Sequence, residues 1–102
     1  MYLVYKISGP HKNDISLIDL STLPIFLGFQ VITGDHQIIL IDPDLPQTPI
    51  VIRLNKPFTI QLGKNKFTGQ LFNDYKRANN VLRFIKLINN FVFWRQLQTS
   101  AS

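Results

Sequence analysis

The sequence predicts an α+β fold, in which a small antiparallel β-barrel or two packed sheets of about seven strands are followed by one long C-terminal helix. In residues 1–72, short runs of alternating apolar residues are separated by Gly, Pro, Asn and Asp. That spacing is typical of an all-β sandwich or barrel. From Asn73 to about Leu97 neither Pro nor Gly interrupts the chain. The apolar residues there recur with a period near 3.6, which indicates a helix.

The composition indicates one globular domain, residues 1–102, with a β-rich part (1–72), the helix (73–98) and a short tail (99–102). Apolar residues make up 45% of the chain, which is typical of a protein with a packed core. No apolar run approaches the ~18 residues needed to span a bilayer. The N-terminal segment lacks the basic residues that open a signal peptide. We therefore expect a soluble, cytoplasmic protein.

Turn-forming residues divide the β-rich part into seven predicted strands. Thr33-Gly34-Asp35 is expected to form a tight hairpin, with Gly34 at positive φ. Residues 42–49 contain three prolines, which cannot donate to a ladder, and are expected to form a rigid loop. Residues 63–66 form a predicted basic hairpin tip. The predicted strands are 2–8, 15–20, 25–32 (with Ile25, Leu27, Phe29 and Val31 on one face), 36–41, 50–54, 58–62 and 67–71.

The predicted helix carries two apolar stripes, and Asn73 or Asp74 is its expected N-cap. The first stripe should pack on a sheet and contains Ala78, Val81, Leu82, Ile85, Ile88 and Val92. The second contains Phe84, Leu87, Phe91 and Trp94. A helix covered by a sheet on one side does not need a second stripe. We interpret it as a protein interface, most simply with a second copy. The alternatives are cover by the chain's own loops, such as the proline-rich segment, and a membrane surface.

Charge is unevenly distributed along the chain. Residues 1–52 have a net charge of −3 and residues 53–102 a net charge of +8. Basic residues without acidic neighbours gain affinity for a polyanion by releasing its counterions, and nearby aromatic rings can stack on unpaired bases. The predicted nucleic-acid-binding residues are Arg53, Lys56, Lys64, Lys66, Lys76, Arg83 and Lys86, with Arg77 and Arg95 placed between the two helix stripes.

The order of seven strands followed by a C-terminal helix resembles the pleckstrin-homology-like arrangement, in which the helix plugs one end of the strands. That resemblance implies a reader of anionic lipids, whose paired basic residues around the first hairpin would be Lys6 and Lys12. An SH3-like or other small barrel with a helical extension has a similar element order. Fold alone does not decide between functions.

The residue types exclude most enzyme chemistries, because the chain has no Cys, no Glu and two His. Cysteine nucleophiles, thiolate zinc sites and glutamate acids or bases are therefore absent. We predict no catalytic residue, no metal ligand and no cofactor. The chain is interpreted as a non-enzymatic module that binds nucleic acid through its basic half. The alternative is a protein-interaction module, such as a small regulator, inhibitor or assembly subunit, that uses the second helix stripe.

Overall fold

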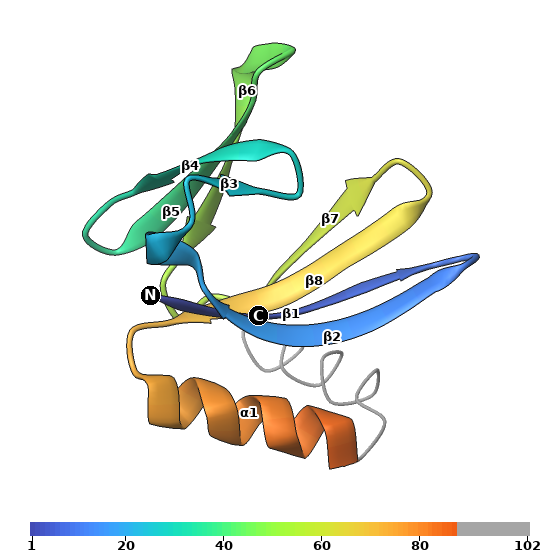
Figure 1. Cartoon of the computed structure of the whole chain (residues 1–102), viewed down its shortest axis with the longest axis vertical. Helices are drawn as coiled ribbons and strands as arrows, with labels where there is room; N and C mark the ends of the chain where they lie inside the picture. Colours follow the sequence, from blue (N-terminus) through green and yellow to red (C-terminus); the bar gives the residue numbers. More distant parts are fainter. Residues whose placement is uncertain (88–102) are drawn as a thin grey trace.

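Eight strands, a 3₁₀ turn and one helix form residues 1–87, the part of the chain that the computed structural model describes (Figure 1). The first sheet has the strand order β2-β1-β8-β7 and the second β3-β4-β5-β6, and all neighbours are antiparallel. The elements are β1 (Tyr2–Gly9), β2 (Lys12–Asp19), the 3₁₀ turn (Leu20–Thr22), β3 (Ile25–Phe26), β4 (Phe29–Thr33), β5 (Gln37–Asp42), β6 (Leu45–Arg53), β7 (Phe58–Leu62), β8 (Asn65–Phe72) and α1 (Tyr75–Leu87).

The α+β class is confirmed, and the strands form two packed sheets that are not closed into a barrel. The sheets meet where Leu54 forms a parallel bridge with Leu71 and the Asn55 N–H donates to the Leu71 carbonyl at 2.8 Å. The helix covers the outer face of the first sheet and plugs no end of it (Figure 1). This arrangement, and the count of eight strands, differ from the pleckstrin-homology-like order.

The main core lies between the two sheets. Along β1, Leu3 and Ile7 point into this core while Val4 points to the helix, as strand alternation requires. The rings of Tyr5 and Phe67 meet edge to face with centroids 5.8 Å apart. The buried members of this core are Leu3, Ile7, Leu20, Phe26, Ile38, Leu40, Ile52, Phe67 and Leu71.

A second core joins the first sheet to α1, and it confirms the first helix stripe as far as the structure describes it. Ala78 and Ile85 are fully buried against Val4 and Phe72, with Val81 and Leu82 beside them. Ile88 and Val92 lie outside the described residues. The Asp74 carboxylate accepts a hydrogen bond from the Lys76 N–H at 3.0 Å, the expected N-cap interaction.

The predicted strand 25–32 is wrong, because a two-residue turn divides it into β3 and β4. Leu27 and Gly28 both have positive φ, 53° and 82°, as in the tight turns that match the twist of a hairpin. Leu27 therefore belongs to neither strand. Ile25 points outward, whereas Phe29 and Val31 pack against the main core. The turn at Thr33-Gly34-Asp35 does form, but Gly34 does not have positive φ.

The proline-rich segment also differs from its prediction, because β6 begins at Leu45 and includes Pro46 and Pro49. This strand is at the edge of the second sheet, where no further strand pairs with its outer side. A proline there removes no hydrogen bond between strands when its nitrogen faces that side. The register shifts between Leu40 and Asp42, next to the prolines. Residues 42–49 thus extend a hairpin arm and do not form a separate loop.

The strained turn at Leu27 gives a stability prediction. Leu rarely adopts positive φ, whereas Asn does so readily, and Leu27 is 41% exposed. Leu27→Asn should therefore raise the free energy of unfolding by about 1 kcal/mol, measured by urea denaturation. Leu27→Ala keeps the strain and serves as the control. A midpoint no higher for the Asn variant than for the Ala variant would contradict the turn geometry.

The packing of α1 gives a second prediction. Ile85→Ala leaves a cavity in the second core and should lower the free energy of unfolding by about 2–5 kcal/mol. Leu87, two residues away, is 82% exposed. Leu87→Ala should therefore change the midpoint of chemical denaturation very little. Equal effects of the two substitutions would show that the packing face is assigned wrongly.

Candidate nucleic-acid interface

The structure separates the predicted basic residues into three groups, all of them exposed. One lies where β6 passes into β7, a second at the β7–β8 hairpin, and the third on α1. They are, in that order, Arg53 and Lys56; Lys64 and Lys66; and Lys76, Arg83 and Lys86.

At the junction of the sheets, Asn55 connects the strands to the helix. It has positive φ, 63°, and its side-chain oxygen accepts a hydrogen bond from the Arg77 guanidinium at 3.4 Å. The same guanidinium lies 5.4 Å from the centre of the Phe72 ring, within the range of a cation–π contact. Arg77 thus joins Lys56 at this place, although its residue type alone did not distinguish it from the other arginines. Arg53 instead shares the outer face of the second sheet with Val51.

The two hairpin tips of the first sheet bring Lys12 close to the second basic group. Ser8 pairs with Lys66 and Gly9 pairs with Lys12. A side chain at Gly9 would collide with Asn65, which shows how closely the tips approach. Both hairpins extend to the same end of the sheet (Figure 1). The result is a second basic surface, separate from α1.

The solvent face of α1 holds the third group. Lys76, Asn80, Arg83 and Leu87 follow one row at i, i+4, i+7 and i+11, opposite the buried Ile85. No acidic residue occurs between Tyr75 and Leu87. A hollow of about 330 Å³ is lined here by Asn80, Arg83, Phe84 and Leu87. This hollow is shallow and mostly open, and its described lining is a guanidinium, an amide and two apolar side chains on one face of the helix.

The second helix stripe is confirmed only as exposed apolar surface, and only for two of its four residues. Phe84 is 48% and Leu87 82% exposed. Phe91 and Trp94 lie outside the described residues. The proline-rich arm belongs to the second sheet, on the other side of the first sheet from α1, so it does not cover the stripe (Figure 1).

Lys6 cannot serve as a surface contact for an anionic lipid. It lies on the helix side of β1 between Ile15 and Thr68, with 9% of its surface exposed. Burial lowers the pKa of its ammonium group from the usual 10.5, because removal from water disfavours the charged form. Of the two lysines that the pleckstrin-homology resemblance implies, Lys12 alone is exposed.

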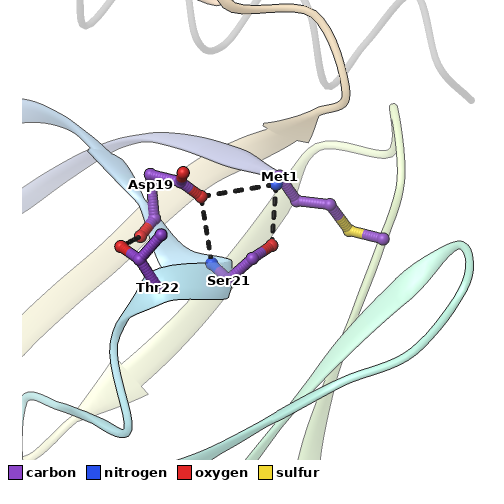
Figure 2. Close-up of polar contacts among 4 residues, drawn as sticks. All are labelled: Met1, Asp19, Ser21 and Thr22. Carbon is purple, nitrogen blue, oxygen red and sulfur yellow. Dashed lines mark hydrogen bonds and ion pairs between the residues drawn. The ribbon is translucent and has the colours of Figure 1, made fainter.

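The N-terminal amine is fixed at one corner of the sheets (Figure 2). It donates to the Ser21 hydroxyl at 2.7 Å and to the Asp19 carboxylate at 3.4 Å. The Ser21 N–H donates to the same carboxylate at 3.2 Å, and the Thr22 hydroxyl donates to the Asp19 carbonyl at 2.9 Å. These bonds hold the 3₁₀ turn against β1. Asp19 therefore has a structural role.

Comparison with protein families, characterised proteins and solved structures gave no match. The helical part of residues 1–87 is not long and apolar enough to cross a bilayer. The function is therefore argued from the surfaces alone.

The buried Lys6 predicts a pH-dependent effect on stability. Below its folded-state pKa the ammonium is charged in both states, so its burial opposes folding. As the pH rises through that pKa towards 10.5, the unfolded chain binds more protons than the folded one, and stability increases. Lys6→Met should therefore be more stable than wild type at pH 7, and the difference should shrink as the pH approaches 10.5.

Urea midpoints at several pH values test this, with the exposed Lys12→Met as the control, for which little change is expected. A Lys6→Met variant that is less stable than wild type at pH 7 would mean that the ammonium group stabilises the fold.

Proposed function

We propose that the protein is a non-enzymatic module that binds nucleic acid through the solvent face of α1. The observation that supports this most directly is the hollow on that face, where Arg83 and Asn80 lie beside the exposed Phe84 and Leu87. A guanidinium can contact phosphate, an amide can bond to a base edge, and apolar or aromatic groups can contact an unstacked base.

The charges of α1 suit a polyanion. Lys76, Arg83 and Lys86 are exposed along a helix that contains no acidic residue. At 1.5 Å per residue, Lys76 and Arg83 are about 10 Å apart along the axis. Since a nucleic-acid strand carries one charge per ~3.4 Å of duplex axis, several phosphates could lie along the row. The junction near the start of α1 adds Lys56 and Arg77.

The aromatic ring provides the preference for unpaired bases. Phe84 flanks the basic row and is about half exposed. Stacking of one base on an aromatic side chain contributes about 1–3 kcal/mol, which is available only where the base is not already stacked in a duplex. We therefore propose single-stranded nucleic acid as the ligand of this face, and both single-stranded DNA and single-stranded RNA should be tested.

The expected result is salt-dependent binding of single-stranded oligonucleotides, measured by fluorescence anisotropy. The double variant Arg83→Ala, Lys86→Ala should weaken binding and flatten the plot of log K against log salt by about 0.7 for each phosphate that the variant no longer neutralises. The double variant Lys64→Ala, Lys66→Ala removes the same charge from the hairpin surface, and it should have the smaller effect.

Three results would count against the proposal. They are no binding of DNA or RNA at low salt, an affinity that does not respond to salt, and a larger loss of affinity for the hairpin variant than for the helix variant. Phe84→Leu separates stacking from charge, because it keeps an apolar side chain without the ring. It should weaken binding of oligonucleotides and leave binding of inorganic polyphosphate unchanged.

A second candidate is a protein-interaction module that uses the same helix. Leu87 is the most exposed large apolar residue of the described chain, and an amphipathic helix that presents such a residue can lie in a partner's groove. Leu87→Gln separates the two candidates, because it removes the apolar side chain without changing the charge of α1. It should abolish binding to a protein partner through loss of an apolar anchor, while the salt dependence of oligonucleotide binding, which the unchanged basic residues set, persists.

A further inference from the structure

The outer face of the second sheet carries an apolar surface that neither core uses. Alternation along the strands places two rows there. Ile32, Ile39 and Val51 are direct cross-strand neighbours on β4, β5 and β6, and they form the first row. Ile25 and Ile41 both pair with Gln30, and these three form the second row.

This face is open to solvent in the described structure. Ile25 is 65%, Ile32 42% and Val51 43% exposed, while Ile39 and Ile41 are half-buried between their neighbours. It is turned away from the first sheet and from α1 (Figure 1). An antiparallel sheet with one solvated face normally alternates apolar and polar residues. Five aliphatic side chains on that solvated face therefore indicate a surface that another molecule covers.

We propose that this face pairs with the same face of a second copy of the chain, about a two-fold axis that lies in the interface perpendicular to the strands. Such an interface is isologous, so it needs a surface that complements itself. An axis midway between the two rows places the first row of each copy on the second row of the other. The aliphatic side chains of the two sheets then interdigitate, as in face-to-face sheet packing.

The charges at the ends of the strands complement each other in this arrangement. Arg53 shares the outer face with Val51 and lies two residues beyond the first row, next to Gln37. At the other end Asp42 lies one residue beyond the second row, so alternation places it on the inner face. The exposed Asp44 follows in the turn, where its N–H donates to the Asp42 carboxylate at 2.9 Å, and it is the acidic residue that Arg53 of the other copy would meet. At ~3.3 Å per residue, Arg53 and the Asp42–Asp44 turn lie at similar distances, within ~10 Å, on either side of the axis.

The same axis therefore brings Arg53 of each copy to the Asp42–Asp44 turn of the other. An axis parallel to the strands would instead place Arg53 over β3, which has no acidic residue. The complementary charges favour a second copy over an unrelated partner, because one chain supplies both members of each pair.

The size of the face sets the expected strength of the dimer. The four strands contain 2, 5, 6 and 9 residues, and at ~3.3 Å per residue and ~4.8 Å between strands they present roughly 350 Å² in projection. A stable interface buries about 800 Å² of accessible surface on each partner. We therefore expect a weak dimer that dissociates on dilution.

Sedimentation equilibrium of the full chain over a range of concentrations tests the proposal. Wild type should shift reversibly from monomer towards dimer. Val51→Lys places a charge in the apolar rows and should weaken the dimer at least ~10-fold. Leu87→Lys, an equal change on α1, should leave it unaffected, and circular dichroism checks that both variants fold.

Charge reversal provides a second readout that does not depend on the Val51 variant folding. Arg53→Asp and Asp44→Arg should each weaken the dimer, and the two together should restore it. A chain that is monomeric at all concentrations would overturn the proposal. This holds even if a different protein were found to bind this face. A dimer that Leu87→Lys disrupts, or one that neither Val51→Lys nor charge reversal affects, would overturn it as well.

Discussion

The pairing of β1 with β8 is the constraint on which the rest of the structure depends. These two strands form the middle of the first sheet, and side chains on both faces of the pair are buried. Leu3 and Leu71 are register partners on the face towards the second sheet, whereas Val4 and Phe72 pack against α1. Each strand thus contributes to both cores, and period-two alternation divides its side chains between them.

This pairing joins segments that are far apart in the sequence, so the chain between them must leave the first sheet and return to it. Strands β3 to β6, which form the second sheet, make up most of that connection. It leaves the first sheet after the 3₁₀ turn, where the N-terminal amine, Asp19 and Ser21 fix the corner, and it returns at the bridge between Leu54 and Leu71. Only the inner face of the second sheet contributes to a core. Packing of the described core therefore does not determine which residue types occupy the outer face of the second sheet.

Patterns that depend on local period were predictable from the sequence. β2 is an exception, because it begins at Lys12, three residues before its predicted start, and ends at Asp19. The β7–β8 hairpin, the inward set Phe58, Phe67 and Leu71, and the buried face of α1 all follow from alternation or from a period of 3.6. Each of these segments has one consistent pattern over five residues or more, which is what such a prediction needs.

Features decided by tertiary context were not predictable in the same way. The turn at Leu27-Gly28 lacks the Asn-Gly or Asp-Gly pair that usually marks such turns, so an unbroken strand was the natural interpretation. Pro46 and Pro49 exclude a central strand but not an edge strand, and strand order is not visible in the sequence. Lys6 follows the alternation of β1, yet its burial depends on strand order, which places β1 between β2 and β8.

The same limit applies to the candidate surfaces. The positive excess of residues 53–102 predicts that a basic surface exists, but register and helix phase decide which charges share a face. They place Lys76 and Arg83 on one row, Lys64 and Lys66 at a distant hairpin, and Arg53 on the second sheet. The outer rows of the second sheet were missed because a run such as Ile38 to Ile41 indicates a strand buried on both faces. The alternation of β4 could have revealed them. Because Phe29 and Val31 face the core, Ile32 must lie on the opposite, outer face.

The two proposed surfaces lie on opposite sides of the molecule, which determines how they could act together. The first sheet separates α1 from the second sheet, so a copy bound to the outer face of the second sheet leaves α1 uncovered (Figure 1). A dimer of this kind would present two helix faces at its two ends. One nucleic-acid strand long enough to reach both would bind the second helix as an intramolecular step, with an effective concentration set by the length of strand between them. The weak dimer and the helix site would then reinforce each other on long ligands and not on short ones, because only a long strand links the two copies.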